Sequence, residues 1–451
     1  MRKMRLASGL LVVLLCLSFS GCSFVEFDAK AQLVPPLASG DEVQVQRALE
    51  EFIASQNQSY LTDQYKLRYP REGSYRTAFI MEDIDSDGDK EAIVFYSTLN
   101  ATETIHVNYL RKIETGWQSI SDLSSDTTDI REVNFADMDG DGTKEMVVGW
   151  VVGTTRDDHL GLYHINNTSL TEIGSYVYTK VLLDKITSSS KSDLLVFHIS
   201  NTDYEVDAKL LTVLDGEALE LGKVKLDGYI ESMDNFAICS FGESEKGIFF
   251  DGYKEGTDLV TELIYWDGEY LSSPFYDESS NISSLTARSS GISSQDVDGD
   301  GIPEWPRSEK MHGNSLTKET DQTSWLTEWC SWDYKTGDIL SKFYSITVPE
   351  DHYYFRIEED WLTSLTSFYN KDLHRLYLCT EDGDGNPVVE LVLYPRDFLE
   401  EVEEDASIPS DEDEFKEIYL RKSDSYVMAR FNAESTLRID ENEVLYRLVS
   451  Y

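Results

Sequence analysis

The sequence is short of basic residues, and this shortage limits the partners that the protein can bind. Its 451 residues include 39 Lys and Arg against 84 Asp and Glu, which gives a formal charge of −45. Such an excess of negative charge argues against nucleic acid or an anionic lipid surface as a partner. Divalent cations and basic partners fit better, and an acidic surface that only keeps an exported protein soluble is the alternative.

Cysteines are also few. Cys16 and Cys22 lie close to the N-terminus, and Cys239, Cys330 and Cys379 are scattered along the rest of the chain. Three scattered thiols have neither the spacing of a disulfide framework nor that of a metal site. We expect them to be buried and free.

Apolar runs long enough to cross a membrane are absent. The apolar stretch Leu10–Leu17 follows Arg2, Lys3 and Arg5, but it is too short for a stable span. A basic start and a short apolar stretch are typical of a signal peptide, which we place at 1–21.

The next residues, Phe19-Ser20-Gly21-Cys22, resemble the lipobox of bacterial lipoproteins, although that motif usually has Leu where this chain has Phe19. The resemblance implies cleavage before Cys22 and a diacylglycerol on its thiol. We therefore expect an extracytoplasmic protein that is anchored to the bacterial cell membrane through Cys22, with a tether over 22–40.

Catalytic motifs are missing as well. The seven His show no HExxH spacing, and the chain has no Gly-x-Ser-x-Gly elbow and no phosphate loop. The acidic residues are too numerous for a glycosidase pair to be selected. We therefore expect no enzymatic activity. A set of tryptophans is expected to pack inside the fold, with stacking on sugars as the alternative: Trp150, Trp266, Trp325, Trp329 and Trp332.

Three nearly identical acidic segments are the main positive feature. They cover 83–91, 137–145 and 296–304, so the first two start 54 residues apart and the last two start 159 apart, or three times 53. This spacing predicts two further repeats in between that have lost most of the acidic motif, and we call these the worn repeats. They are found at Lys185–Asp193 and near Cys239–Gly247, where an apolar strand follows but most carboxylates are gone.

A period near 50 residues with several strands per repeat is typical of a propeller blade. In the first repeat we expect strands at 78–83, 92–98, 106–113 and 117–123. The predicted fold is mainly β: a small propeller of about five blades over 75–348. The Tyr60–Tyr69 region is a candidate for part of a sixth blade.

The flanking regions differ from the repeats. Asp41 can cap a helix that runs to about Ser55, and 41–74 is expected to hold this helix and a lead-in. After Pro349 the repeat pattern ends, and we expect an α+β domain over 349–451. Its strands are predicted at 373–379, 388–394, 418–420 and 426–430, with a helix at 441–448 and a hairpin turn at 381–386.

The chemistry of the three acidic loops indicates calcium. Carboxylates stand at loop positions 1, 3, 5 and 9, and Gly stands at position 6, where it permits a bend with positive φ. The position-7 carbonyl can add a further oxygen. Oxygen ligands at this density suit about three calcium ions, and the absence of His and Cys from the loops argues against zinc or copper. The predicted ligands are Asp83, Asp85, Asp87, Asp89, Glu91, Asp137, Asp139, Asp141, Thr143, Glu145, Asp296, Asp298, Asp300, Ile302 and Glu304.

An EF-hand would need Glu at position 12, where this chain has Val94, Val148 and Arg307. The pattern Asp-x-Asp-x-Asp-Gly-x-x-Glu before an apolar strand instead resembles the FG-GAP and VCBS repeats of integrin-α-like propellers. That family usually has Asp at position 9, where this chain has Glu91, Glu145 and Glu304, and here Pro306 interrupts the strand after the third loop. The resemblance implies structural calcium near one face and a partner surface commonly on the opposite face.

These features together predict a non-enzymatic surface lipoprotein that acts as a calcium-stabilised binding scaffold for a protein or glycan in the cell envelope. One alternative is a carbohydrate-active hydrolase or lyase built on the propeller. Another is a structural envelope-assembly lipoprotein, which would show a flat apolar patch.

Overall fold

The computed structural model describes residues 40–56, 65–99, 101–153, 157–187, 190–200, 202–255, 258–311, 322–380, 387–395, 418–421, 425–431, 437, 439 and 441–450. The predicted signal peptide, Cys22, most of the tether, the 381–386 turn and the acidic stretch Asp397–Glu414 lie outside these residues. None of the described helices is long and apolar enough to cross a membrane.

The protein is mainly β, and its strands form several antiparallel sheets. The first sheet holds β1 (Tyr65–Leu67), β2 (Phe79–Glu82), β3 (Glu91–Thr98), β4 (Ala101–Ile113) and β5 (Gly116–Ser125). The second has β6 (Asp129–Ala136), β7 (Glu145–Val151), β8 (His159–Asn166) and β9 (Ser169–Val177). In the first repeat the strands lie where the sequence predicted them.

Two further sheets come from the worn repeats. The third holds β10 (Lys180–Asp184), β11 (Asp193–Ile199), β12 (Val206–Leu214) and β13 (Glu217–Leu226). The fourth holds β14 (Ser232–Ser240), β15 (Lys246–Tyr253), β16 (Leu259–Trp266) and β17 (Leu271–Ser272). In both sheets the strands pair in chain order, as they do in the second sheet.

The last two sheets draw on distant parts of the chain. The fifth has β18 (Trp305–Lys310), β20 (Trp325–Trp332), β21 (Ile339–Val348), β22 (Tyr353–Ile357) and β28 (Leu448–Ser450). The sixth has β19 (Gln322–Thr323), β23 (Leu365–Asn370), β24 (Arg375–Thr380), β25 (Val389–Pro395), β26 (Ile418–Arg421) and β27 (Ser425–Phe431). Backbone pairing of β21 with β22 runs across the predicted boundary at 348/349.

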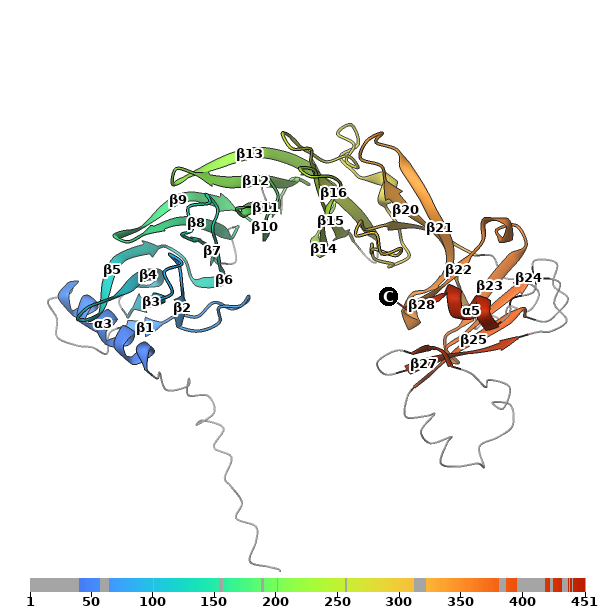
Figure 1. Ribbon diagram of the computed structural model, residues 1–451, viewed down its shortest axis with the longest axis horizontal. Coiled ribbons are helices and arrows are strands. Elements are labelled where there is room, and N and C mark those ends of the chain that lie inside the picture. The colour runs from blue at the N-terminus through green and yellow to red at the C-terminus, as the bar shows by residue number, and fades with distance from the viewer. Residues whose placement is uncertain are drawn as a thin grey trace, which may run out of the picture.

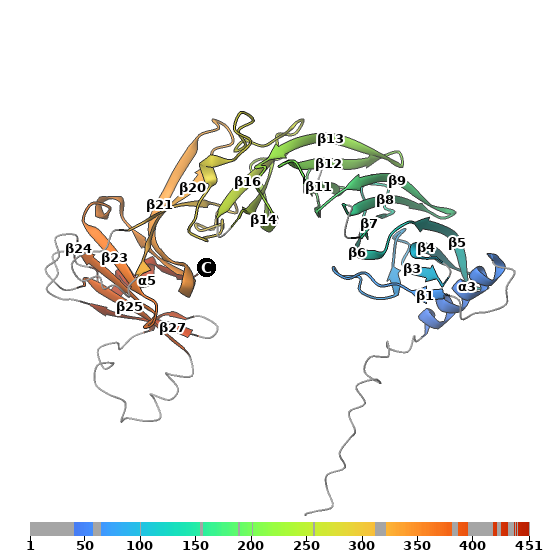
Figure 2. The ribbon, with the colours of Figure 1, turned by 180° about the vertical axis from the view of Figure 1, so that it is seen from behind.

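The sheets follow an open arc, in which each packs against its neighbours in the chain (Figures 1 and 2). Apolar cores lie between the first and second sheets, the second and third, the third and fourth, the fourth and fifth, and the fifth and sixth. In the described part of the chain no core joins the first sheet to the sixth, so the sheets do not close into the ring expected from the repeats.

The second strand of each repeat shows why these segments become strands. All residues of β3 except the last are buried, as are all but the last of β7. Such a strand has a sheet or helix against both of its faces and therefore reads as a continuous apolar run rather than an alternation. β1 pairs with β3, so the described part of the Tyr60–Tyr69 region extends the first sheet and does not form a sixth blade.

Two α-helices in the described part of the chain flank the arc. Helix α3 (Asp41–Gln56) covers the residues predicted to be helical, and it buries Val45, Ala48 and Leu49 against the first sheet. Helix α5 (Glu441–Arg447) also lies where the sequence placed it. The thiols of Cys239, Cys330 and Cys379 are free and buried, as expected.

Candidate metal loops and the opposite end of the sheets

The three acidic segments occupy equivalent positions in three sheets. Loop 1 (83–91) joins β2 to β3, and loop 2 (137–145) joins β6 to β7. Loop 3 (296–304) is closed by an isolated bridge between Gln295 and Glu304 and leads into β18. The worn segments at 185–193 and 239–247 join β10 to β11 and β14 to β15, so all five repeats place this segment at the same strand junction.

The position-9 glutamate closes each loop from inside. The carboxylates of Glu91, Glu145 and Glu304 are buried. Each accepts a hydrogen bond from the backbone N–H of loop position 2, at 3.0 Å from Ile84, 2.8 Å from Met138 and 3.0 Å from Val297. In the worn third repeat, Asp193 accepts the equivalent bond from Ile186 at 3.2 Å. The loop-closing role therefore survives where the other carboxylates are lost.

The carboxylates at loop positions 1 and 5 stabilise the tight turn of each loop by accepting hydrogen bonds from backbone N–H groups. In loop 2, Asp137 accepts hydrogen bonds from Gly140 at 2.6 Å and from Gly142 at 3.1 Å. The position-6 glycines have positive φ, at 94° for Gly88, 92° for Gly142 and 85° for Gly301, as the sequence predicted. The position-5 carboxylate in each loop accepts the N–H of position 7, which is Asp89, Thr143 or Ile302.

Carboxylate oxygens converge within each loop. Ligand atoms lie within 4.8 Å of one another in four sets: Asp83 with Asp85 and Glu91; Asp137 with Asp139 and Asp141; Asp139 with Glu145 and His164; and Asp296 with Asp298 and Asp300. Several buried oxygens there accept no hydrogen bond, namely Asp83 Oδ1, Asp85 Oδ1 and Glu304 Oε1. A hard cation would satisfy such oxygens, so the residues of these loops fit calcium.

A basic side chain from elsewhere in the same sheet reaches each loop. Arg111 of β4 places Nη2 2.6 Å from Asp85 Oδ2 and Nε 3.6 Å from Glu91 Oε1. Lys342 of β21 places Nζ 2.8 Å from both Asp298 and Asp300. The sequence analysis missed both residues, although Glu91 and Arg111 each lie next to the paired residues Ala92 and Leu110 of β3 and β4.

Loop 2 has a histidine in this place. Nδ1 of His164 lies 3.0 Å from Glu145 Oε1. A histidine can be neutral, whereas Arg and Lys carry a fixed positive charge at neutral pH. Among the described residues, loop 2 is therefore the one of the three that has no permanently charged counter-ion beside its carboxylates.

Burial sets the acidity of the position-9 glutamates. It raises the pKa of Glu145 to about 7, against the opposing effect of hydrogen bonds from Met138 and His164. It also raises the pKa of Glu304 to about 7, against the hydrogen bond from Val297 and the charge of Lys342. A bound cation would favour the charged form of both groups.

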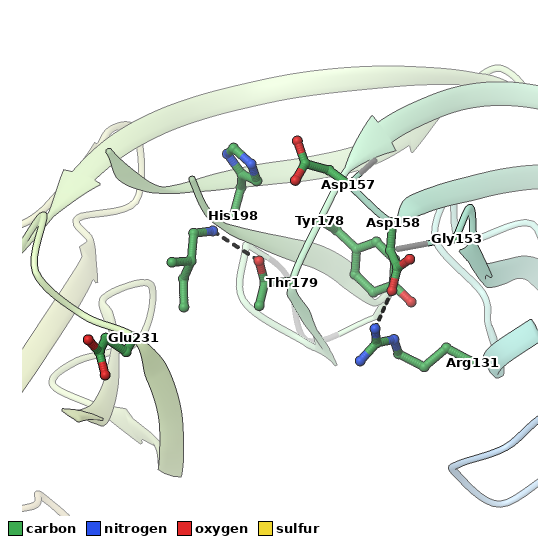
Figure 3. Close-up of a pocket in the computed structure, with 9 residues that line it drawn as sticks. Arg131, Gly153, Asp157, Asp158, Tyr178, Thr179, His198 and Glu231 are labelled. Atoms are coloured by element: carbon green, nitrogen blue, oxygen red, sulfur yellow. Dashed lines mark hydrogen bonds and ion pairs between the residues drawn. The ribbon is translucent and has the colours of Figure 1, made fainter. Parts of the chain in front are cut away.

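The opposite end of the sheets carries a polar cavity. Because antiparallel strands alternate in direction, the turns between the second and third strands lie at the far end from the metal loops, as do the links between sheets. There a cavity of about 270 Å³ is lined by Arg131, Gly153, Asp157, Asp158, Tyr178, Thr179, His198, Ile199 and Glu231. Figure 3 shows the ion pair of Arg131 with Asp158 at one side of this cavity and Glu231 at the other.

A second cavity, of about 530 Å³, lies between helix α3 and the first sheet. His106 lines it, and Nδ1 of this histidine lies 2.9 Å from Asp122 Oδ2. Asp122 also accepts hydrogen bonds from Tyr96 and Asn108, and the Tyr96 ring stacks on His106. Phe52, Ile53 and Ile120 form the apolar part of the lining.

The tryptophans named from the sequence are core residues. Trp150, Trp266, Trp329 and Trp332 are buried, and Trp325 is half-buried. Among the described residues the exposed aromatic side chains are tyrosines, which the sequence analysis did not single out. A local sequence pattern does not show which aromatic ring lies on the surface.

No protein-family model matches the chain, and no curated protein matches it. Among solved structures, the exotype rhamnogalacturonan lyase YesX aligns with 9% identity and a TM-score of 0.27, over 68% of this chain and 71% of that one. The Bacillus licheniformis rhamnogalacturonan lyase PL11 aligns with 10% identity and a TM-score of 0.27, over 68% of this chain and 70% of that one. The Dos1 propeller aligns with 9% identity and a TM-score of 0.25, over 71% of this chain and 91% of that one. TM-scores of this size carry no argument about fold family or function.

Proposed function

We propose that this protein is a non-enzymatic, calcium-stabilised binding scaffold, anchored to the outside of a bacterial cell membrane through Cys22. The observation that carries the proposal is the recurrence of one acidic loop, closed by a buried glutamate, at the same junction of three sheets. Repetition of a costly buried carboxylate at equivalent positions favours a common ligand over three unrelated acidic turns.

Electrostatics supports calcium as that ligand. Two unit charges about 4 Å apart repel by roughly 1 kcal/mol even in water, and more when buried. Loop 2 brings several such pairs together through Asp137, Asp139, Asp141 and Glu145, and among the described residues His164 is the basic side chain that contacts them. A divalent cation would relieve this repulsion and hold the strand junction. The propeller-like arrangement of the sheets and the ligand role of all fifteen predicted residues are part of this proposal.

The test is calcium-dependent stability. The fragment 23–451 should gain thermal stability in millimolar calcium, and Asp→Asn changes at position 3 of each loop (Asp85, Asp139, Asp298) should each reduce the gain. Asp267→Asn, in the turn between β16 and β17 and outside the three loops, is the matched control. An unchanged melting midpoint on addition of calcium would contradict the proposal.

A carbohydrate-active enzyme is the second candidate, and the His106–Asp122 pair favours it. A carboxylate that holds Nδ1 of a histidine leaves Nε2 as the ring nitrogen available to a substrate, which is the arrangement of a general base. Turnover of a polysaccharide by the wild type that is lost in His106→Gln would support this candidate. Turnover that is equal in both would contradict it.

A further inference from the structure

Two exposed tyrosines lie against each other, with their rings tilted, at the end of the sheets opposite the acidic loops. Tyr204 is 65% exposed and Tyr229 is 51% exposed, with ring centroids 5.2 Å apart and planes inclined by 41°. Tyr204 belongs to the turn between β11 and β12, and Tyr229 belongs to the link between β13 and β14. Both therefore lie at the end that holds the polar cavity, of which Glu231 is a lining residue.

The backbone that carries Tyr204 is constrained. Its φ is 54°, a left-handed conformation that is unfavourable for a bulky side chain. The side-chain amide of Asn281 donates to the Tyr204 carbonyl at 3.0 Å. Asn281 itself accepts a hydrogen bond from Tyr276 at 2.8 Å. A third loop therefore holds Tyr204 in this conformation.

The loop that carries Tyr229 is held in place by a buried carboxylate. The backbone N–H of Tyr229 donates to Asp227 at 3.0 Å, and Asp227 is fully buried and paired with Lys254 at 2.5 Å. A Cβ on Gly228 would lie 2.2 Å from the Tyr204 carbonyl oxygen, so only glycine allows the two loops to approach this closely. The two rings are therefore exposed to solvent but carried on constrained backbone. Tyr204 has a strained φ, Gly228 is required between the loops, and the Asp227–Lys254 ion pair is buried beneath Tyr229.

The surroundings of the rings are acidic. Asp203 and Glu205 flank Tyr204, and Glu231 lies two residues after Tyr229. The third loop adds Asp277 and Glu278. Lys225 lies 3.9 Å from Glu205, and no described basic side chain forms an ion pair with Asp203, Glu231, Asp277 or Glu278. The charged side chains around the rings are therefore mostly acidic.

We infer that Tyr204 and Tyr229 form a preorganised platform for an arginine-containing segment of a basic partner protein. A planar guanidinium stacks on aromatic rings, and the surrounding carboxylates add charge attraction. The net charge of the chain disfavours an anionic glycan at this surface, and a neutral glycan would donate hydrogen bonds to these carboxylates but gain no charge attraction from them. This inference rests on the proposed scaffold function and names the partner class.

The experiment measures hexa-arginine binding to the 23–451 fragment by calorimetry, in calcium and at raised salt, which screens long-range attraction more than close stacking. The double variant Tyr204→Ala/Tyr229→Ala should bind about tenfold more weakly, because each lost cation–π contact weakens binding several-fold. The double variant Tyr204→Phe/Tyr229→Phe keeps both rings and should bind within about twofold of the wild type. Tyr270→Ala is the matched control, since Tyr270 is 64% exposed but lies at the turn between β16 and β17, at the other end of the sheets.

Hexa-lysine should bind more weakly than hexa-arginine, because it has equal charge but no planar group to stack. Equal binding of hexa-arginine to the wild type and the double alanine variant would overturn the inference. So would absence of binding to the wild type, or a tyrosine-dependent affinity for cellohexaose in its place. The calcium-induced shift in melting midpoint, recorded on the same samples, reports on the scaffold proposal separately, so a failure of the platform alone is recognisable.

Discussion

The guanidinium of Arg111 lies 2.6 Å from the carboxylate of Asp85, inside the first acidic loop. Both side chains are largely buried, at 19% and 18% exposure. The chain thus supplies a positive charge of its own to a loop whose residues also fit calcium. Lys342 has the same relationship to loop 3, so calcium bound as we propose would compete with a side-chain cation in these two loops and would displace His164 from Glu145 in loop 2.

Replacement of Arg111 should make loop 1 more dependent on calcium. Arg111→Gln is expected to lower stability in EDTA by about 2 kcal/mol, since it leaves Asp85 and Glu91 without their charged partner. Calcium should restore most of this loss, so the calcium-induced shift in melting midpoint becomes larger than in the wild type. Arg71→Gln is the control, because Arg71 is 58% exposed and pairs with Asp129 at the start of β6, the end of that strand opposite loop 2. A smaller calcium shift in Arg111→Gln would contradict the competition.

Loop 2 should contribute one separable calcium site. Asp141→Ala removes one carboxylate from the set that includes Asp137 and Asp139, and it should delete one site while the other loops keep theirs. The readout is calorimetric stoichiometry. Asp126→Ala, in an exposed turn outside the loops, should leave the number of sites unchanged. Loss of every site in Asp141→Ala would show that the loops are not independent.

Stability should fall as pH rises from about 4.5 to about 7, in part because of one buried glutamate. Burial raises the pKa of Glu262 to about 7, although hydrogen bonds from Asp227 and Ser283 favour its charged form. The native state therefore holds a proton that the unfolded state releases above its ordinary pKa, and this stabilisation is lost as pH rises through 7.

Glu262→Gln mimics the protonated form and should reduce this pH dependence by up to about 3 kcal/mol. The measurement is the difference in unfolding free energy between pH 5 and pH 8, made in saturating calcium so that the loop carboxylates stay ligated. The same pH dependence in the variant and the wild type would refute the assignment to Glu262.

Membrane attachment should depend on Cys22. Cys22→Ala removes the thiol that the lipobox-like segment would present for acylation, so the protein should leave the detergent-extractable membrane fraction. Cys16→Ala, within the predicted signal peptide, is the control and should be processed normally. Retention of Cys22→Ala in the membrane at the wild-type level would show that the anchor lies elsewhere.

Local sequence signals predicted the repeats well, for a physical reason. Each loop needs glycine at position 6 and an apolar strand directly afterwards, and both requirements are visible in a short stretch of residues. The worn segment at Lys185 was found because Leu194–Phe197 follows it at the right spacing, even though most carboxylates are gone. Its Asp193 keeps the loop-closing hydrogen bond to Ile186.

Features that depend on distant residues were not predicted. β28 joins the fifth sheet through pairing of Leu448 with Phe355, two residues that are separated in the chain by strands β23 to β27 of the sixth sheet. The contact of Lys342 with Asp298 depends on the placement of three strands relative to one another. The exposure of Tyr204 follows from a turn that another loop holds in place through Asn281. None of these relationships leaves a periodic pattern in the sequence.

The most direct test of the account is a pair of thermal melts of the 23–451 fragment, one in EDTA and one in millimolar calcium, with calorimetric counting of bound ions. Each site that binds only the folded state should add about 2.7 kcal/mol when calcium is in hundredfold excess over its Kd. The account predicts a clear rise in the melting midpoint and about three sites, with magnesium a poor substitute because it requires tighter octahedral geometry. An unchanged midpoint with a stoichiometry near zero would contradict it and would leave the three loops as acidic turns held by Arg111, His164 and Lys342.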